Sequence, residues 1–220
     1  GTKAANRRKP LPVPPKMKAG DLVCDRDAVV PAIDCPGTRH EQFVVWKNRK
    51  IVTTCWRFDH DLHFQYWSAG AKTQQPEDIA DVMTSIGACF FMSRERFWQL
   101  GGLDEGHGSW GQFGVEIALK SHLSGGRHVV NKRTSYSHLF RTKGGDQWGF
   151  PYPMGGRQAD RARAYSQNLW LHNRWPGQVR PLSWLIEKFA PAPGWHEPVG
   201  AERLRQVTEA GLAFARARNN

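Results

Sequence analysis

Short apolar runs alternate with helix-forming segments from residue 85 to residue 173, and this alternation limits the possible folds more than any other feature of the sequence. The run 85–92 has the length and composition of a strand, and Ser93 directly after it is a good N-cap for a short helix. The segments 115–123 and 157–173 have the apolar spacing of helices. Because alternating strands and helices pack as layers, the sequence predicts a mixed α/β fold rather than a sandwich or a helical bundle.

The earlier part of the chain predicts further strands. The segments 28–33, 42–46, 50–58 and 63–67 are rich in Val, Ile, Thr and aromatic residues, which favour strands. We expect the second and third of these segments to form a hairpin, because a short polar turn separates them. The segment 69–84 is polar and irregular, and it predicts a surface loop.

The first 20 residues differ from the rest in composition. Residues 1–18 hold six of the 31 Lys and Arg residues and no acid, in a chain of net charge +11. Four prolines in the same stretch predict a basic, extended leader over residues 1–20. A basic leader can bind nucleic acid, anionic lipid or phosphorylated ligands. No nucleic-acid-binding motif accompanies it, so nucleic acid is disfavoured as a partner.

Composition excludes several classes of protein. Hydrophobic residues make up 40% of the chain and aromatic residues 11%, which is too much for a disordered protein. No run of about 18 apolar residues is present, so we expect no membrane span. The basic leader lacks the apolar stretch of a secretory signal. The four cysteines have no C-x-x-C spacing, which argues against a zinc site and favours reduced thiols in a cytoplasmic protein.

The segment GGLDEGHGSWGQFGVE is the first candidate for chemistry. It places Asp104 and Glu105 on a glycine-rich loop, Trp110 and Gly111 further along it, and Glu116 at the start of a helix. Glycines let a backbone approach a ligand, and carboxylates can bind sugar hydroxyls, hold a metal or accept a proton. The alternative is structural: Asp104 caps a turn, and Glu116 is an ordinary acid on a helix face.

A second candidate is the short element His138-Leu139-Phe140-Arg141. An imidazole can bind a metal, although a lone His is more often a hydrogen-bonded structural residue. Arg141 can meet a diphosphate with two parallel hydrogen bonds. Two D-x-D triplets, at Asp25 to Asp27 and Asp59 to Asp61, are weaker candidates for a divalent cation.

Taken together, these segments resemble the C-terminal half of a glycosyltransferase with the GT-A fold, close to the family-2-type enzymes and the polypeptide N-acetylgalactosaminyltransferases. The resemblance runs from about residue 28 to residue 175. It rests on Gly87 to Arg94 with the following "GG-x-D-E" turn, on Trp110-Gly111 with Glu116, on the "H-x-F-R" element at His138, and on the segment 150–156, which is similar to the end of a mobile lid.

The resemblance implies a fold and a domain organisation. The fold would be the C-terminal half of a GT-A domain, with a mixed sheet flanked by helices and a helical C-terminal extension. The partial GT-A domain would cover residues 21–156, and the extension would cover residues 157–220. The nucleotide-binding half that comes first in the family has no counterpart in this sequence, so we expect a missing N-terminal half.

The resemblance also implies an activity, which is metal-dependent transfer of a sugar from a nucleotide-sugar donor, with a UDP-sugar favoured, to a glycan, peptide or other hydroxyl acceptor. His138 would bind Mn²⁺ or Mg²⁺, and imidazole suits Mn²⁺ better. Arg141 would stabilise the leaving diphosphate. Trp110 and Tyr152 would close over the sugar, and Gly111 would line the same site. Glu116 would contact the sugar or act as base, with Asp104 and Glu105 beside it.

The chain departs from the family pattern at one place. The related transferases have an acid shortly after Trp-Gly, where this chain has Phe113 and Gly114. Two other interpretations of the sequence stay open. One is a half-domain that binds carbohydrate or a partner without catalysis, and the other is a basic nucleic-acid-binding protein.

Overall fold

The computed structural model describes residues 28–30, 43–45, 53–74, 76–108, 110–134, 136 and 157–219. They belong to two compact units, Gly1–Val52 and Thr53–Asn220. In the first unit, β1 (Ala28–Val30) pairs antiparallel with β2 (Phe43–Val45). The expected hairpin of segments 42–46 and 50–58 stays a prediction, because residues 46–52, which include its turn, lie outside the described residues.

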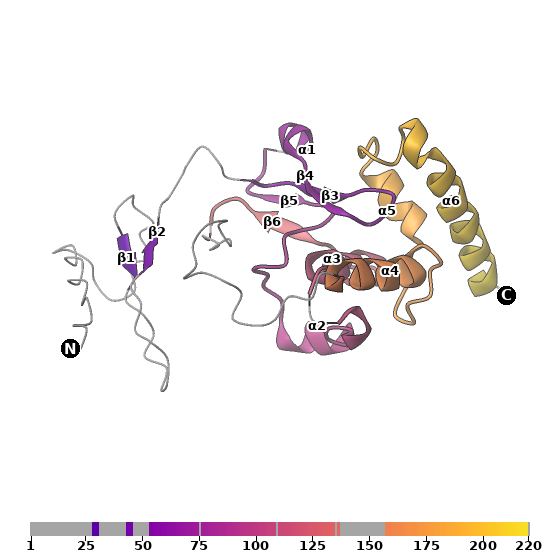
Figure 1. Cartoon of the computed structure of the whole chain (residues 1–220), viewed down its shortest axis with the longest axis horizontal. Helices are drawn as coiled ribbons and strands as arrows, with labels where there is room; N and C mark the ends of the chain where they lie inside the picture. The colour runs from indigo at the N-terminus through magenta and orange to yellow at the C-terminus, as the bar shows by residue number, and fades with distance from the viewer. Residues whose placement is uncertain are drawn as a thin grey trace, which may run out of the picture. The chain divides into compact units, whose positions relative to one another are not determined.

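The second unit contains the remaining helices and strands. In chain order these are β3 (Trp56–Phe58), β4 (Phe64–Tyr66), α1 (Ser68–Thr73), β5 (Ile79–Asp81), α2 (Arg94–Gln99), the 3-10 turn η2 (Glu105–His107), α3 (Phe113–Leu123), β6 (Val129–Asn131), α4 (Gln158–Trp170), α5 (Leu182–Lys188) and α6 (Pro198–Asn219). Figure 1 shows the strands beside the helices of this unit. The mixed α/β architecture is confirmed.

The sheet is smaller than expected. In the described residues, β3 pairs with β4 and β5 pairs with β6, each antiparallel, and a bridge between Trp56 and Thr84 adds one further strand contact. The loop expected over 69–84 is wrong, because this segment contains most of α1 and all of β5. The GT-A arrangement as a whole stays a prediction.

The segment 85–92 does not form the expected strand. A Cβ placed on Gly114, in the first turn of α3, would lie 1.9 Å from the backbone oxygen of Ser85 and 2.9 Å from the nitrogen of Gly87. The segment therefore packs its backbone against the start of a helix. This close approach requires glycine at position 114.

Helix α2 begins after Ser93, as the sequence predicts. The hydroxyl oxygen of Ser93 accepts a hydrogen bond from the backbone nitrogen of Arg96, at 3.1 Å. Gly101 and Gly102 follow the helix with φ angles of +78° and +64°, a conformation that favours glycine. This end directs the chain into the candidate site.

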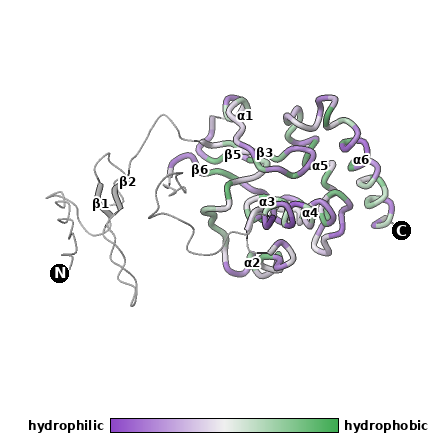
Figure 2. Tube along the Cα trace, in the orientation of Figure 1, coloured by the Kyte–Doolittle hydropathy of each residue, from purple (hydrophilic) through white to green (hydrophobic). Residues whose placement is uncertain are grey.

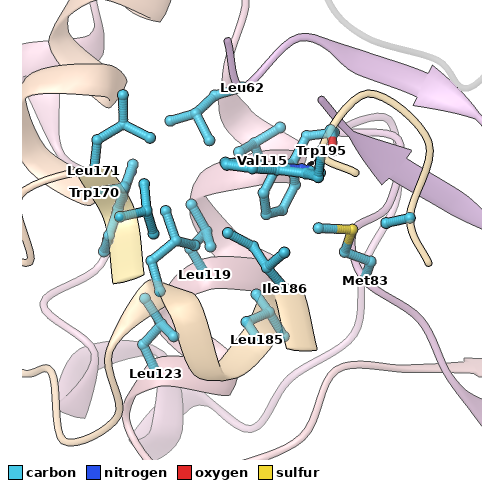
Figure 3. Packing of buried hydrophobic residues seen from close by; sticks show 14 residues of the cluster. Leu62, Met83, Val115, Leu119, Leu123, Trp170, Leu171, Leu185, Ile186 and Trp195 are labelled. Atoms are coloured by element: carbon cyan, nitrogen blue, oxygen red, sulfur yellow. Dashed lines mark hydrogen bonds between the residues drawn. The ribbon is translucent and has the colours of Figure 1, made fainter. Parts of the chain in front are cut away.

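One hydrophobic core joins the strands to the C-terminal helices. Figure 3 shows Leu62, Met83 and Leu119 in the same cluster as Ile186 and Trp195. The side chains of Trp170 and Trp195 are fully buried, and Trp195 Nε1 donates a hydrogen bond to the backbone oxygen of Phe58, at 2.9 Å. The helices after residue 157 therefore share their core with the preceding strands and α3.

No helix in the described part of the chain is both long enough and apolar enough to cross a lipid bilayer. Helix α6 has 22 residues, but Figure 2 shows hydrophilic and hydrophobic residues mixed along it.

Two histidines lie against each other between α3 and the start of β6. The side chain of His122 is fully buried, and its Nε2 lies 2.9 Å from the backbone oxygen of Val82. Its ring centroid is 6.1 Å from that of His128. His122 Nδ1 and His128 Nε2 are both buried without a hydrogen-bond partner among the described residues. Burial lowers the pKa of each imidazole to about 4.

We expect these two histidines to make the fold acid-sensitive. The unfolded chain binds protons at its ordinary histidine pKa near 6.5, whereas the folded chain does not until about pH 4. Stability is therefore fully present above pH 6.5 and falls as the pH falls. Between pH 6.5 and pH 5 the loss should be on the order of 1.5 kcal/mol for each imidazole.

Urea unfolding at a series of pH values measures this loss. Replacing both residues, in His122→Asn with His128→Asn, should flatten the stability profile in that interval. His172→Asn, which changes an exposed histidine, should leave the profile as in the wild type. A wild-type profile that is already flat from pH 6.5 to pH 5 would contradict the prediction.

Candidate functional site

The glycine-rich turn between α2 and α3 is built around Asp104. Its Oδ1 accepts a hydrogen bond from the backbone nitrogen of Gly106 at 2.9 Å, and this contact caps the 3-10 turn η2. The interpretation of Asp104 as a turn cap is therefore confirmed. Burial raises the pKa of Asp104, but hydrogen bonds from Gly106 and Tyr165 and the nearby His107 and Lys120 outweigh this effect. The net result is a lowered pKa.

Glu116 points into the protein, underneath the same turn. Only 2% of the residue is exposed. Its Oε1 accepts hydrogen bonds from the backbone nitrogen of Asp104 and from Lys120 Nζ, both at 2.7 Å. Its Oε2 lies 3.4 Å from His107 Nδ1. Glu116 therefore does not face solvent, and its hydrogen bond to the turn makes it more than an ordinary acid on a helix face.

Lys120 completes this buried pair. It lies one helical turn after Glu116 on α3, which places both side chains on the same face. Its Nζ also donates a hydrogen bond to the backbone oxygen of Gly102, at 2.8 Å. The pair therefore binds both the start of the turn, at Gly102, and its middle, at Asp104. It fixes the backbone of the turn to α3.

Helix α4 contacts the turn with three of its residues. Tyr165 donates a hydrogen bond from its hydroxyl to Asp104 Oδ2, at 2.9 Å. Ser166 Oγ lies 2.9 Å from His107 Nε2. Gly111 has a φ of +125°, and a Cβ placed on it would lie 2.9 Å from Ala159 Cα. The turn therefore contacts both α3 and α4. Because Gly111 has no side chain, α4 can pack closely on the turn at this position.

Two of the predicted site residues face solvent. Glu105 is exposed, and the side chain of Trp110 is 43% exposed. Both lie on the same short turn as the partly exposed Asp104. Two carboxylates and an aromatic ring on one rigid turn can accept hydrogen bonds from sugar hydroxyls and cover an apolar sugar face. Their roles in binding or catalysis stay predictions.

The other predicted site residues, His138, Arg141 and Tyr152, lie outside the described residues. Within the described part of the chain, no three His, Cys, Asp or Glu side chains are arranged to hold a metal ion. The described residues therefore supply no metal site of their own, and the dependence on Mn²⁺ or Mg²⁺ stays a prediction.

The D-x-D triplet at Asp59 has a local structural role. Asp59 Oδ1 accepts hydrogen bonds from the backbone nitrogens of Asp61 and His63, both at 3.0 Å. Its Oδ2 accepts a hydrogen bond from Gln65 Nε2, at 2.8 Å. These contacts shape the turn between β3 and β4. The other triplet, at Asp25, lies outside the described residues.

Sequence reasoning missed Lys120, His107, Tyr165 and Ser166. The spacing of Glu116 and Lys120 is a recognisable pattern for an ion pair on a helix, so that contact could have been found. The contacts of Tyr165 and Ser166 join residues 61 and 59 positions apart. No local pattern in the sequence indicates them.

We expect the buried pair to be essential for stability. Glu116→Gln leaves Lys120 as a buried charge without a counterion, and removal of one partner from such a pair costs roughly 3–5 kcal/mol. Lys120→Met should cost a similar amount. The double variant should cost clearly less than the sum of the two, because it leaves no unpaired charge.

Urea unfolding of the four proteins gives the coupling between the two residues. Glu209→Gln, which changes an exposed acid on α6, serves as the control and should stay within about 0.5 kcal/mol of the wild type. Additive losses in the double variant would show that the two side chains do not act as a pair.

Comparison with known proteins supports the resemblance. No family model matches the chain. A Drosophila melanogaster protein named "Putative polypeptide N-acetylgalactosaminyltransferase 13" is 29% identical over 131 residues, which are 59% of this chain and 22% of that protein. N-acetylgalactosaminyltransferase 6 of the same species is 38% identical over 72 residues, 30% of this chain and 11% of the relative.

A human relative gives the same result. Polypeptide N-acetylgalactosaminyltransferase 10 of Homo sapiens is 29% identical over 86 residues, which are 38% of this chain and 14% of that protein. The match to the first Drosophila protein spans about a fifth of that relative's length. Part of this chain is therefore similar to a limited part of the polypeptide N-acetylgalactosaminyltransferases.

Proposed function

We propose that this chain is part of a glycosyltransferase that moves a sugar from a nucleotide-sugar donor to a hydroxyl acceptor. The observation that carries the proposal is the turn from Gly101 to Gly111, on which a buried network supports solvent-facing carboxylates. The similarity to N-acetylgalactosaminyltransferases favours UDP-N-acetylgalactosamine as donor and a peptide as acceptor.

The described residues divide into two roles in this proposal. Glu116 and Lys120 hold the turn from inside, so Glu116 acts through the position of the turn. Asp104 and Glu105 accept hydrogen bonds from sugar hydroxyls, and Trp110 covers one face of the sugar and excludes water. A rigid turn of this kind stabilises the bound sugar because its carboxylates need no reorganisation when the ligand arrives.

The remaining residues enter the proposal through the resemblance. His138 would hold Mn²⁺ or Mg²⁺, Arg141 would neutralise charge on the diphosphate, and Tyr152 would close over the sugar. When bound, such a metal supplies positive charge for the leaving diphosphate.

Binding without transfer is the second candidate function, and one observation favours it. Phe113 stands near the place where the related enzymes have an acid, and it packs on Phe90 with ring centroids 5.3 Å apart. An aromatic side chain there can neither accept a proton nor bind a sugar hydroxyl. A half-domain that binds the donor or a glycan without transferring a sugar would use the same turn and the same exposed carboxylates.

Titration calorimetry with UDP-N-acetylgalactosamine and MnCl₂ tests the proposal. We expect binding by the wild type and a loss of affinity of about tenfold in Trp110→Ala, or about 1.4 kcal/mol. Trp98→Ala removes another exposed tryptophan, on α2, and should bind as the wild type does. His138→Ala should lose the dependence of binding on Mn²⁺.

A second measurement separates transfer from binding. Release of UDP in the presence of a Ser- and Thr-rich peptide indicates transfer, and donor binding without UDP release favours the second candidate. Absence of donor binding contradicts the proposed transfer, and it is the result expected of a half-domain that binds only a glycan or a partner. Binding to RNA that weakens steeply with salt and disappears when residues 1–18 are removed would support the nucleic-acid alternative instead.

The cytoplasmic location expected from the cysteines also stays a prediction. Cys55 and Cys89 are free thiols, and burial raises the pKa of Cys55 to about 11.

A further inference from the structure

Helix α4 directs the side chain of Tyr165 at Asp104, a partly exposed carboxylate of the turn. The Tyr165 hydroxyl donates to Asp104 Oδ2 at 2.9 Å. The Tyr165 ring lies edge-on to the ring of His107, with centroids 4.9 Å apart. A Cβ placed on Gly106 would lie 2.3 Å from Tyr165 Cζ, so the turn has no room for a larger residue there. The side chain of Tyr165 therefore lies against Asp104, His107 and Gly106.

The Asp104 carboxylate is fixed but not saturated. Its Oδ1 accepts one hydrogen bond from Gly106 and its Oδ2 accepts one from Tyr165. An ionised carboxylate has about four acceptor sites, so about two stay open. The residue is partly exposed, which lets a ligand reach these sites. The carboxylate is therefore oriented by the protein and available to a donor from outside.

Other contacts do not need the Tyr165 hydroxyl. Helix α4 also packs on the turn through Ala159 beside Gly111, and Ser166 contacts His107. The core contains Trp170 from the end of the same helix. These contacts join α4 to the turn and to the core independently of the Tyr165 hydroxyl, so its hydrogen bond to the partly exposed carboxylate bears mainly on the direction of Asp104.

We infer that Tyr165 is a positioning residue whose hydroxyl sets the direction in which Asp104 accepts hydrogen bonds from the hydroxyl groups of the transferred sugar. This inference rests on the proposed function. It makes α4, which lies beyond the region expected to form the transferase domain, a part of the sugar site. Tyr165 itself touches the carboxylate and not the sugar.

Tyr165→Phe tests the inference with the ring retained. Loss of the hydroxyl removes one of the hydrogen bonds that lower the pKa of Asp104, so this pKa should rise. The affinity for UDP-N-acetylgalactosamine with MnCl₂ should fall by about threefold to tenfold at pH 7. The loss should become larger as the pH falls toward 4, because the variant takes up a proton on Asp104 earlier than the wild type.

Two further variants complete the design. Gly106→Ala pushes the Tyr165 ring away while the hydroxyl is retained, and it should reproduce both effects of Tyr165→Phe. Tyr66→Phe removes the hydroxyl of an exposed tyrosine on β4 and should change neither quantity. The pKa of Asp104 is read from ¹³C-carboxyl NMR of the full chain without ligand, and the affinity from calorimetry at each pH.

The outcomes distinguish this inference from the proposed function. A wild type that binds no donor contradicts the proposed function. A wild type that binds, with Tyr165→Phe showing the same affinity and the same pH dependence, overturns only the inference. A lower thermal midpoint without a change in the pH dependence of binding shows a structural role alone and also overturns it. An unchanged Asp104 pKa in Tyr165→Phe overturns it without any ligand.

Discussion

The ion pair of Glu116 and Lys120 holds the candidate site together. Both residues are about 2% exposed, and a buried charge is costly unless it is paired and hydrogen-bonded. Here each charge has a counterion at 2.7 Å and one backbone partner on the turn. The low polarity around the pair strengthens these contacts. The glycine-rich turn therefore has one geometry relative to α3.

The three acids of this segment have different surroundings although they stand close together in the sequence. Glu116 faces inward and contacts Lys120, His107 and a backbone amide. Asp104 lies at the boundary, partly exposed, with one hydrogen bond to each oxygen. Glu105 faces solvent. The environment, rather than the residue type, gives the first acid a supporting role and leaves the other two accessible to solvent.

Local signals in the sequence predict local structure well in this protein. The Ser93 cap and the glycines after α2 act within a few residues, so they are readable without a structure. For segment 85–92, the prediction from local signals is wrong. Its composition favours a strand, but the contact of Ser85 with Gly114 is made by a residue almost 30 positions away. Tertiary contacts of this kind override propensity.

The candidate site, too, could be predicted from the sequence only in part. The turn and its acids were recognisable because glycines and carboxylates cluster in sequence. The contact of Tyr165 with Asp104 was not, because no pattern relates two residues 61 positions apart. The structure thus adds the supporting side chains to a set of exposed residues that the sequence already indicates.

The core shared across residue 157 has a consequence for how this protein can change by recombination. Trp195 packs in the same cluster as Phe58, and Val207 of α6 belongs to it as well. An exchange of gene segments at residue 157 would separate tryptophans from the strands that they cover, and neither product would inherit a closed interior. The strands and the last three helices must therefore be inherited as one piece.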